Sequence, residues 1–135
     1  MAKVSFYLFE KSPERQVDST CRLCRKILRE PQRIWLYSAD PALQQALDER
    51  LWSFDVGSFI PHGIDAPTAQ VCISAQLPTE NDWIVFNFNE QALEQFAKFS
   101  HIIEIIENHE TAKQLGREKY KQYRRLGIEP QTHKL

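Results

Sequence analysis

The sequence alternates between short apolar runs and stretches in which apolar residues recur every three or four positions. The first pattern is typical of strands buried on both faces, and the second is typical of helices with one apolar side. We predict five strands, at residues 3–9, 34–37, 71–74, 83–88 and 101–106.

The helical stretches lie between these strands or after the last of them. We predict helices at residues 18–29, 41–51, 91–96 and 110–126. Asp18 or Ser19 can cap the first helix, and Asp40 followed by Pro41 begins the second. Residues 52–67 follow neither period and are predicted to be irregular.

The last predicted helix has signals at both ends. Asn108 or His109 can accept a hydrogen bond from the first turn. Gly127 stands just past the last turn, where a left-handed residue commonly ends a helix. Ile128 can then fold back onto Tyr123, so we predict a Schellman-type stop.

Strands that alternate with helices indicate a doubly wound α/β fold, with a mainly parallel sheet and helices on both faces. A chain of 135 residues fits one domain, so we assign residues 1–135 to a single α/β domain. We expect the last ~7 residues to form a flexible tail.

Composition places the protein among ordinary globular chains, with 42% hydrophobic and 26% charged residues. No apolar run approaches the roughly 20 residues that span a bilayer, and the N-terminus has no signal-peptide pattern. A cytoplasmic location is therefore expected. Three cysteines, an odd number, indicate reduced thiols rather than a disulfide framework.

The net charge of −1 conceals an uneven distribution along the chain. Residues 111–135 contain seven Lys or Arg residues but only Glu118 and Glu129 as carboxylates, which gives this segment +5 and leaves −6 for residues 1–110. Such a split indicates an anionic partner at one end of the molecule.

The doubly wound fold often binds nucleotides, and this chain lacks the required loop. Phosphate binding needs glycines after the first strand, so that backbone N–H groups can approach the anion. The turn after Phe9 has none, and the four glycines of the chain form no nucleotide motif. We therefore exclude a nucleotide cofactor.

The candidate catalytic and metal-binding residues have simpler explanations. Cys21 and Cys24 have the spacing of a redox pair, but both fall on the apolar stripe of their helix, which favours packing in the core. A zinc site would need a second pair of ligands, and none stands at metal spacing. His62 has no carboxylate at a catalytic spacing, which favours a structural role. We expect no enzymatic activity, no metal and no cofactor.

One side of the last predicted helix is cationic and carries a tyrosine. A 3.6-residue period places five residues on this side, which we call the basic face: Lys113, Arg117, Tyr120, Lys121 and Arg124. The residues expected on the opposite side, toward the sheet, are Ala112, Leu115, Gly116, Tyr123 and Leu126. We also expect Gly116 to let another surface approach the helix closely.

The basic face suits an acidic peptide that ends in an aromatic residue. Its cations would meet the carboxylates, and the tyrosine ring with the lysine stems would form an apolar floor. The alternative is a solvated helix end whose cations are favoured by the helix dipole. Composition alone does not separate these two interpretations.

A second candidate surface lies in the irregular segment. Its large apolar residues follow no period: Trp52, Phe54, Val56, Phe59 and Ile60. Aromatic residues in such a segment can anchor a protein interface. The alternative is that they wedge the end of the second helix onto the core.

Three blocks of the sequence resemble the chi subunit family of bacterial DNA polymerase III holoenzyme. They are Phe6-Tyr7-Leu8, Leu51-Trp52 with Ser58-Phe59-Ile60-Pro61-His62, and Gln114-Leu115-Gly116-Arg117-Glu118-Lys119-Tyr120-Lys121-Gln122-Tyr123-Arg124 with Gly127. These blocks lie at both ends and in the middle, so the resemblance covers essentially the whole chain. The segment between Asp65 and Asn81 is shorter than in the family, and nothing is carried over to it.

The resemblance implies a non-catalytic adaptor in DNA replication. Members of the family have a doubly wound fold without nucleotide binding and pair with the psi subunit, which tethers them to the clamp loader. They also bind the acidic, phenylalanine-terminated tail of single-stranded DNA-binding protein. In some members the aromatic surface also receives a helicase.

The resemblance also implies which residues meet each partner. The tail site matches Lys113, Arg117, Tyr120 and Lys121, with Arg124 on the same helix side, and the psi interface matches Trp52, Phe59, Ile60 and Pro61. Two other classes remain open. A protein that binds single-stranded DNA directly could use the same basic helix. A redox or hydrolytic enzyme is the second alternative, and a redox enzyme would need Cys21 and Cys24.

Overall fold

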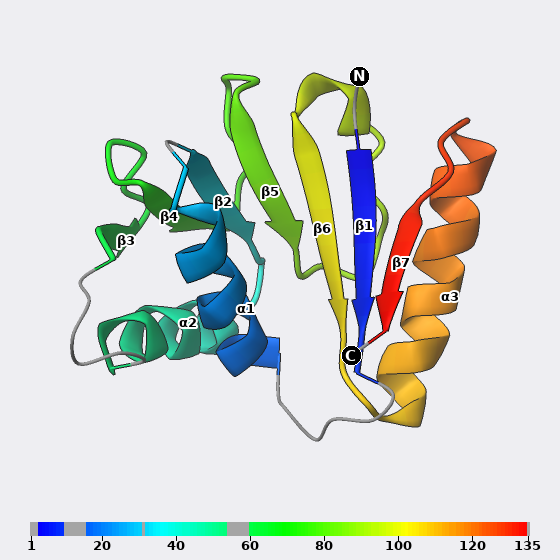
Figure 1. The fold of residues 1–135 in the computed structure, drawn as a ribbon, viewed down its shortest axis with the longest axis horizontal. Coiled ribbons are helices and arrows are strands. Elements are labelled where there is room, and N and C mark those ends of the chain that lie inside the picture. The colour runs from blue at the N-terminus through cyan, green and yellow to red at the C-terminus, as the bar shows by residue number, and fades with distance from the viewer. Residues whose placement is uncertain (1–2, 10–15, 31, 54–59, 135) are drawn as a thin grey trace.

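The computed structural model describes residues 3–9, 16–30, 32–53 and 60–134. The seven strands in these ranges form one sheet in which every pairing is parallel, in the order β3-β4-β2-β5-β6-β1-β7 (Figure 1). Their bounds are β1 Lys3–Leu8, β2 Arg33–Tyr37, β3 His62–Ile64, β4 Val71–Ser74, β5 Trp83–Asn87, β6 His101–Ile106 and β7 Gln131–Lys134.

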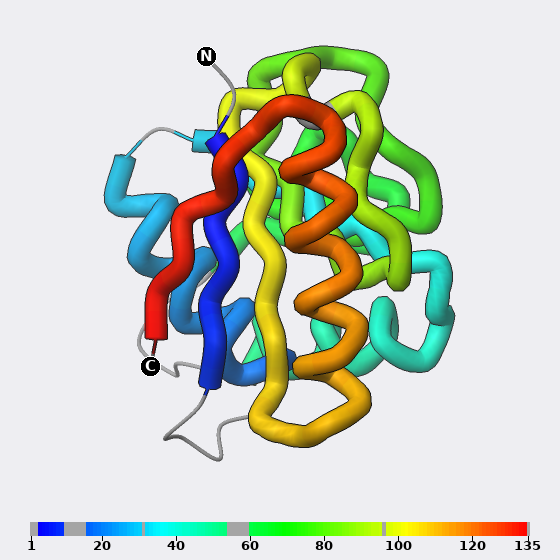
Figure 2. The backbone as a smooth tube through the Cα atoms, turned by 90° about the vertical axis from the view of Figure 1, so that its right-hand side faces the viewer, coloured from blue at the N-terminus to red at the C-terminus, as the bar shows by residue number. Residues whose placement is uncertain are grey.

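Helices cover both faces of this sheet. The α-helices are α1 (Gln16–Ile27), α2 (Pro41–Ser53) and α3 (Glu110–Arg125), and a short 3₁₀ helix, η1, spans Phe96–Lys98. α1 and α2 lie on one face, and α3 lies on the other, beside β6 and β1 (Figures 1 and 2). This arrangement confirms the predicted single-domain α/β fold.

Each face of the sheet has its own hydrophobic layer. Under α1 and α2, Leu36 and Phe86 of the sheet pack with Leu47 of α2. Under α3, Phe6 and Trp83 pack with Tyr123 of the helix. Along the buried strands, successive side chains alternate between the two layers. The apolar runs in the sequence predicted strands that are buried on both faces, and this alternation agrees with that prediction.

The five predicted strands are present, and the structure adds two. β3 is only three residues long, and β7 consists of polar residues that are all exposed. β7 lies along β1 at the edge of the sheet, where the sequence predicted a tail. An exposed edge strand needs no apolar residues, so hydrophobic periodicity does not detect it.

The predicted helix at residues 91–96 is wrong. Residues 91–95 form a bend, irregular backbone and a turn, and η1 begins only at Phe96. The backbone here is held by side chains of α3: Gln122 Oε1 accepts from Ala92 N at 2.8 Å, and the Tyr123 hydroxyl accepts from Leu93 N at 3.2 Å. These tertiary hydrogen bonds replace the ones that a helix would make.

The ends of α3 confirm the capping signals. His109 Nδ1 accepts from Ala112 N at 3.2 Å, and Gly127 has a φ of 95°. Ile128 N donates to Tyr123 O at 3.2 Å and Gly127 N donates to Arg124 O at 3.0 Å, the two hydrogen bonds of a Schellman motif. The turn after Gly127 leads the chain back along β1 as β7.

The buried side of α1 explains the Cys21-Cys24 pair. Both thiols are free and fully buried in the layer under α1 and α2. Burial raises the pKa of Cys21 to about 12 and raises that of Cys24 as well. A redox pair needs an accessible thiolate, so the interpretation as core residues is confirmed.

None of the described helices is long and apolar enough to span a bilayer.

Candidate partner-binding surfaces

α3 packs unusually close to β6 because of Gly116. A Cβ atom added at Gly116 would lie 2.8 Å from Cδ1 of Ile106. The surface that approaches Gly116 is therefore the protein's own sheet. The prediction that Gly116 lets a separate surface approach the helix is wrong. Leu115 and Leu126, predicted to face the sheet, are 37% and 41% exposed.

The side of α3 that does face the sheet carries a buried charged network. Glu104 of β6 is fully buried and accepts hydrogen bonds from Lys119 Nζ, the Tyr123 hydroxyl and Asn87 Nδ2, each at 2.7 Å. Burial raises the pKa of the Glu104 carboxyl, and the charge of Lys119 opposes this shift. The network fixes the helix on the sheet. The sequence did not predict this network, because Lys119 belongs to a run of polar residues that is typical of a solvent-exposed helix side.

A pocket opens between the basic face and the edge of the sheet. Its volume is about 250 Å³, and it lies where α3 passes over the carboxyl ends of β1 and β6 and beside β7. We call it the α3 pocket. It is lined by Phe6, Leu8, Phe9, Ile106, Glu107, Lys113, Gly116, Arg117, Tyr120 and Thr132.

The floor of the α3 pocket is apolar and its rim is cationic. Phe6 meets the ring of Tyr120 edge to face, with 5.5 Å between ring centroids. Lys113 and Arg117 stand on the rim contributed by the helix. Gly116 and Ile106 both line the α3 pocket. A Cβ atom at Gly116 would collide with Ile106, so the glycine allows the helix to lie this close to the sheet at the pocket.

Within the described residues, the ion pairs made by cations of the basic face are exposed. Arg117 Nη2 lies 3.2 Å from Glu110 Oε1, and the two side chains are 59% and 82% exposed. Arg124 pairs at 3.5 Å with the exposed Glu129. Such pairs contribute little stability and are exchanged readily for a better anion. No internal carboxylate neutralises Arg117 among the described residues.

The structure brings together only part of the predicted tail site. Lys113, Arg117 and Tyr120 line the α3 pocket, whereas Lys121 and Arg124 lie outside it, toward the C-terminal half of the helix. The strand residues of the pocket come from β1, β6 and β7, and the sequence analysis missed them. They could not be found by helical periodicity, because they are far from α3 along the chain.

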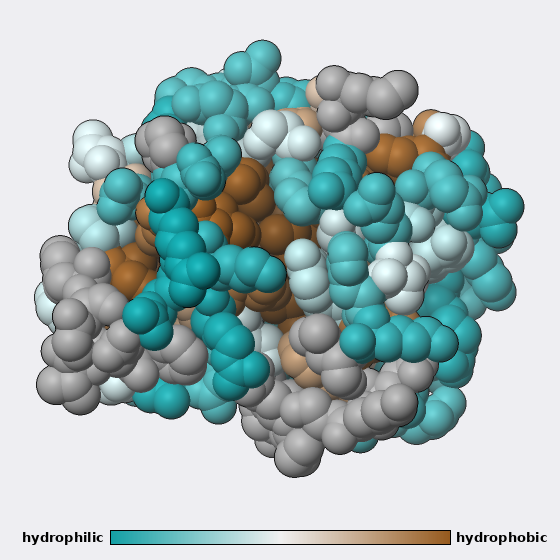
Figure 3. Space-filling view, viewed as in Figure 1, coloured by the Kyte–Doolittle hydropathy of each residue, from teal (hydrophilic) through white to brown (hydrophobic). Residues whose placement is uncertain are grey.

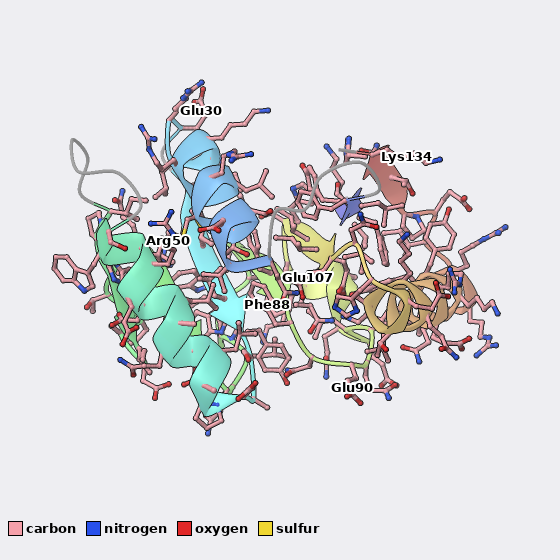
Figure 4. The ribbon with its side chains drawn as sticks, turned by 90° about the horizontal axis from the view of Figure 1, so that it is seen from below. Glu30, Arg50, Phe88, Glu90, Glu107 and Lys134 are labelled. Atoms are coloured by element: carbon pink, nitrogen blue, oxygen red, sulfur yellow. The ribbon has the colours of Figure 1, made fainter. Side chains whose placement is uncertain are left out.

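The pocket also contains one carboxylate. Glu107 follows β6 and accepts a hydrogen bond from Gln16 N at 3.1 Å, so it holds the first turn of α1. Its other oxygen lies 3.5 Å from Nε2 of His109. Figure 4 shows Glu107 at the carboxyl end of the sheet, between α1 and α3. An acidic ligand must therefore keep its carboxylates on the Lys113 and Arg117 side.

The aromatic surface is only partly within the described residues. Trp52, at the end of α2, is 61% exposed and meets the ring of His62 with 5.1 Å between centroids. Ile60 is buried in the core, and Pro61 is half-buried. Phe59 lies outside the described residues. Among the predicted psi-interface residues that the structure describes, Trp52 is the exposed aromatic residue.

His62 holds this corner of the molecule together. Nδ1 lies 2.7 Å from the carbonyl oxygen of Ile60, and Nε2 lies 3.1 Å from the carbonyl oxygen of Asp48 in α2. The side chain is fully buried. Nε2 also lies 3.3 Å from Oδ1 of Asp48, a carboxylate partner that spacing in the sequence did not indicate. These contacts join the end of α2 to β3, which agrees with the structural role predicted for His62.

One serine–histidine contact occurs within the described residues. Ser5 Oγ lies 2.8 Å from Nε2 of His101, a serine–histidine contact that the sequence did not reveal. Ser5 is fully buried, so a substrate could not reach its hydroxyl. Burial, with the nearby charges of Lys3 and His133, lowers the pKa of His101 to about 4. No group of three metal-ligating side chains occurs among these residues.

The fold and the site define a class of protein. The chain is a doubly wound α/β protein without a phosphate-binding loop, and its last helix forms an apolar pocket with a cationic rim. Comparison with known proteins then identifies the family. The family model described as "DNA polymerase III chi subunit, HolC" matches residues 1–131.

Individual relatives agree with this match. The DNA polymerase III subunit chi of Pseudomonas aeruginosa is 30% identical over 139 aligned residues, which cover 100% of this chain and 98% of that protein. The subunit of the same name from Haemophilus influenzae is 26% identical and covers 94% of each chain. That of Escherichia coli K12 is 23% identical, with 98% of this chain and 97% of the relative covered. The chain belongs to the DNA polymerase III chi subunit family, as its sequence resemblance predicted.

Proposed function

We propose that this protein is a non-catalytic adaptor of the replicative DNA polymerase III holoenzyme. It links the clamp loader, through the psi subunit, to the acidic C-terminal tail of single-stranded DNA-binding protein. The observation that carries the proposal is the α3 pocket, in which an apolar floor and two cations stand side by side. Membership of the chi family supports the same conclusion.

The chemistry of the α3 pocket matches a peptide that ends in an aromatic residue. The terminal ring would enter the floor of Phe6, Leu8 and Ile106, where it is removed from water. Its terminal carboxylate would meet Arg117 and Lys113 at the rim, through charge-assisted hydrogen bonds. Upstream acidic residues would lie along Lys121 and Arg124, which continue the positive charge toward the end of the helix.

The geometry of Tyr120 favours a peptide over a nucleic acid at this helix. Its ring is half-buried and already meets Phe6, and its hydroxyl lies 3.3 Å from Glu129. A stacking platform for bases needs an exposed aromatic face. The basic face can therefore form the wall of a pocket more readily than a platform for a single strand.

The two partner surfaces lie far enough apart to work together. Trp52 is at the end of α2, on the β3 side of the sheet, and α3 is at the β7 side (Figure 1). The psi subunit would bind the first surface and the tail would bind the second. Linking the polymerase assembly to the protein that coats the template raises their effective concentration without any new contact.

The test is the affinity for an acidic peptide that ends in phenylalanine. Arg117→Ala removes a charge-assisted contact worth about 1.5–3 kcal/mol, so the affinity should fall at least about tenfold. Arg125→Ala is the matched control, because Arg125 is an exposed arginine of the same helix that does not line the α3 pocket. Fluorescence anisotropy with a labelled peptide measures both.

A second peptide that lacks the final phenylalanine tests the floor of the pocket. It should bind weakly to the wild-type protein, because the apolar floor is then unfilled. Normal tail binding by Arg117→Ala, or equal binding of the two peptides, would show that the tail binds elsewhere.

A further inference from the structure

His62 lies at the corner of the molecule where the end of α2 meets the edge strand β3, and both of its ring nitrogens face oxygen atoms. The side chain is fully buried. Nδ1 lies 2.7 Å from the carbonyl oxygen of Ile60, and Nε2 lies 3.1 Å from the carbonyl oxygen of Asp48. Oδ1 of Asp48 lies 3.3 Å from the same Nε2. Within the described part of the chain, the polar atoms that meet this ring are therefore acceptors.

The number of protons on the ring decides how many of these contacts are hydrogen bonds. A neutral imidazole has one N–H and one lone pair, so it can donate to Ile60 or to Asp48. The other nitrogen then points its lone pair at an oxygen. The imidazolium has two N–H groups and can donate to both. Both contacts are hydrogen bonds only when His62 is protonated.

The charged surroundings of the ring come from α2. Asp48 places its carboxylate at Nε2. α2 ends at Ser53, so its last turns, with their partial negative charge, are also close. On the other side, β4 pairs Val71 with His62, and this side chain carries no charge. Among the described residues, Asp48 is therefore the titratable group that faces the ring.

Trp52 connects the buried ring to the surface of the molecule. Trp52 follows Asp48 by four residues, so the two side chains lie on the same side of α2. Trp52 is 61% exposed, and its ring meets that of His62 with 5.1 Å between centroids and 66° between planes. His62 thus contacts the helix turn on which the exposed tryptophan stands, through the main chain of Asp48 and through the tryptophan ring.

The same corner exposes a second apolar side chain. Of the four large hydrophobic residues that are exposed in the described ranges, two lie here, Trp52 and Ile64. Ile64 follows His62 by two residues in β3, so the two side chains stand on the same face of that strand. The neighbouring surface over α1 is largely hydrophilic (Figure 3). We call Trp52 and Ile64 the β3 corner, which fits a partner with an apolar contact surface.

We propose that the protonation of His62 controls partner binding at the β3 corner. With both hydrogen bonds formed, the ring holds the turn that carries Trp52 against β3, and the partner meets a preorganised anchor. Loss of the proton removes one hydrogen bond and turns a lone pair toward an oxygen, which loosens this turn. The affinity for the partner therefore falls as the pH rises. That the partner is the psi subunit rests on the proposed function, whereas the link between His62 and Trp52 does not.

An NMR titration of the intact free protein tests that link. The ¹⁵N shifts of the His62 ring show how many of its nitrogens carry a proton, from about pH 5 to about pH 9, the range in which histidines titrate. The indole N–H signal of Trp52, assigned by its loss in Trp52→Phe, should move with the same midpoint. Asp48→Asn removes the carboxylate at Nε2 and should shift both midpoints together to lower pH.

The affinity for the psi subunit, measured by calorimetry over the same pH range, tests the consequence. It should fall at least about fivefold from low to high pH, the equivalent of about one net hydrogen bond, with the midpoint of the His62 ring. His62→Gln keeps an N–H donor but no titratable group, so its affinity should match that of the wild-type protein at high pH and should not vary with pH. Thermal unfolding checks that each variant is folded.

His133→Gln is the matched control. His133 is an exposed histidine of β7, at the opposite edge of the sheet from β3. Its replacement should leave the pH profile of psi binding unchanged. If His62→Gln does not fold, Asp48→Asn takes its place, because it must shift the profile of psi binding by the same amount as the midpoint of the His62 ring.

Three results would overturn the proposal. They are a His62 ring that keeps the same number of protons over the whole range, a Trp52 signal that does not follow the ring, and a pH dependence of psi binding that persists in His62→Gln. Failure of the wild-type protein to bind psi at every pH would instead contradict the proposed function. The shared midpoint of His62 and Trp52 in the free protein would still decide whether the ring controls the corner.

Discussion

The least expected residue of the molecule is a glutamate with no access to water. Glu104 lies in the centre of β6 under α3, and its carboxylate meets three donors. A buried charge without such partners would be costly. Lys119 is therefore part of the interior, although it belongs to a helix whose neighbouring residues are polar and exposed.

Lys119→Met should destabilise the protein by about 3 kcal/mol, because it leaves a buried carboxylate without its countercharge. The effect should depend on pH with a defined sign. Burial already raises the pKa of Glu104, and Lys119 lowers it, so the variant raises it further. A carboxyl whose pKa is raised by folding stabilises the folded state at low pH and loses this contribution as the pH rises.

The destabilisation by Lys119→Met should therefore shrink as the pH falls from about 8 to about 5. Urea unfolding at several pH values measures this. Adding Glu104→Gln to the variant removes the charge itself and should recover much of the loss. An equal destabilisation at every pH would mean that the carboxyl of Glu104 is not the source of the effect.

At the scale of elements, the sequence predicts those whose signals are local. The apolar runs mark β1, β2, β4, β5 and β6, and the caps mark both ends of α3. β7 carries no such signal, because its polar residues are ordered only by pairing with β1. The non-helical backbone at Ala92 and Leu93 depends on Gln122 and Tyr123, which are remote in sequence.

The candidate site, like the elements, has one part with a local sequence signal and one part that depends on residues distant in the sequence. Helical periodicity places Lys113, Arg117 and Tyr120 on one side of α3, and in the structure all three line the α3 pocket. The floor of that pocket comes from Phe6 and Leu8 at the other end of the chain. A sequence pattern within one helix cannot show which strand lies beneath it, so the rim was predictable and the floor was not.

Gly127 tests the link between α3 and β7. Its φ of 95° is unfavourable for residues with a side chain, but a Cβ there would meet nothing within 4 Å. Gly127→Ala should therefore lower the free energy of unfolding by about 1–2 kcal/mol through backbone strain alone. Gly127→Asn should lower it less, since asparagine tolerates this conformation. Urea unfolding compares them, and equal losses would point to a cause other than the backbone.

At the scale of the whole molecule, the sheet separates the surfaces proposed to bind partners. Trp52 lies beside β3, at one edge of the sheet, and the α3 pocket lies beside β7, at the other edge (Figure 1). The strands between them are buried in two packed layers. A rigid separator of this kind suits a tether, whose ends must hold two partners without excluding either.

Two contacts of different chemistry should respond differently to salt. The proposed tail contact would depend on exposed cations, which are screened within about 8 Å at physiological ionic strength, so it should weaken as salt rises. The proposed psi contact would depend on an exposed tryptophan and should change little over the same range, because apolar burial is not screened. Titrations of the wild-type protein with each partner, from about 50 to about 300 mM NaCl, measure both.

Trp52→Ala completes the comparison, because it removes the exposed anchor without altering α3. It should weaken psi binding by about 2 kcal/mol or more, as expected for an aromatic hot spot, and leave the tail affinity and its salt dependence unchanged. Arg117→Ala should give the reverse pattern. Because the two residues lie at opposite edges of the sheet, the double variant should show the sum of the single effects. A tail affinity that changes with Trp52→Ala would mean that the sheet transmits binding from one edge to the other, and the molecule would then be a coupled switch instead of a passive tether.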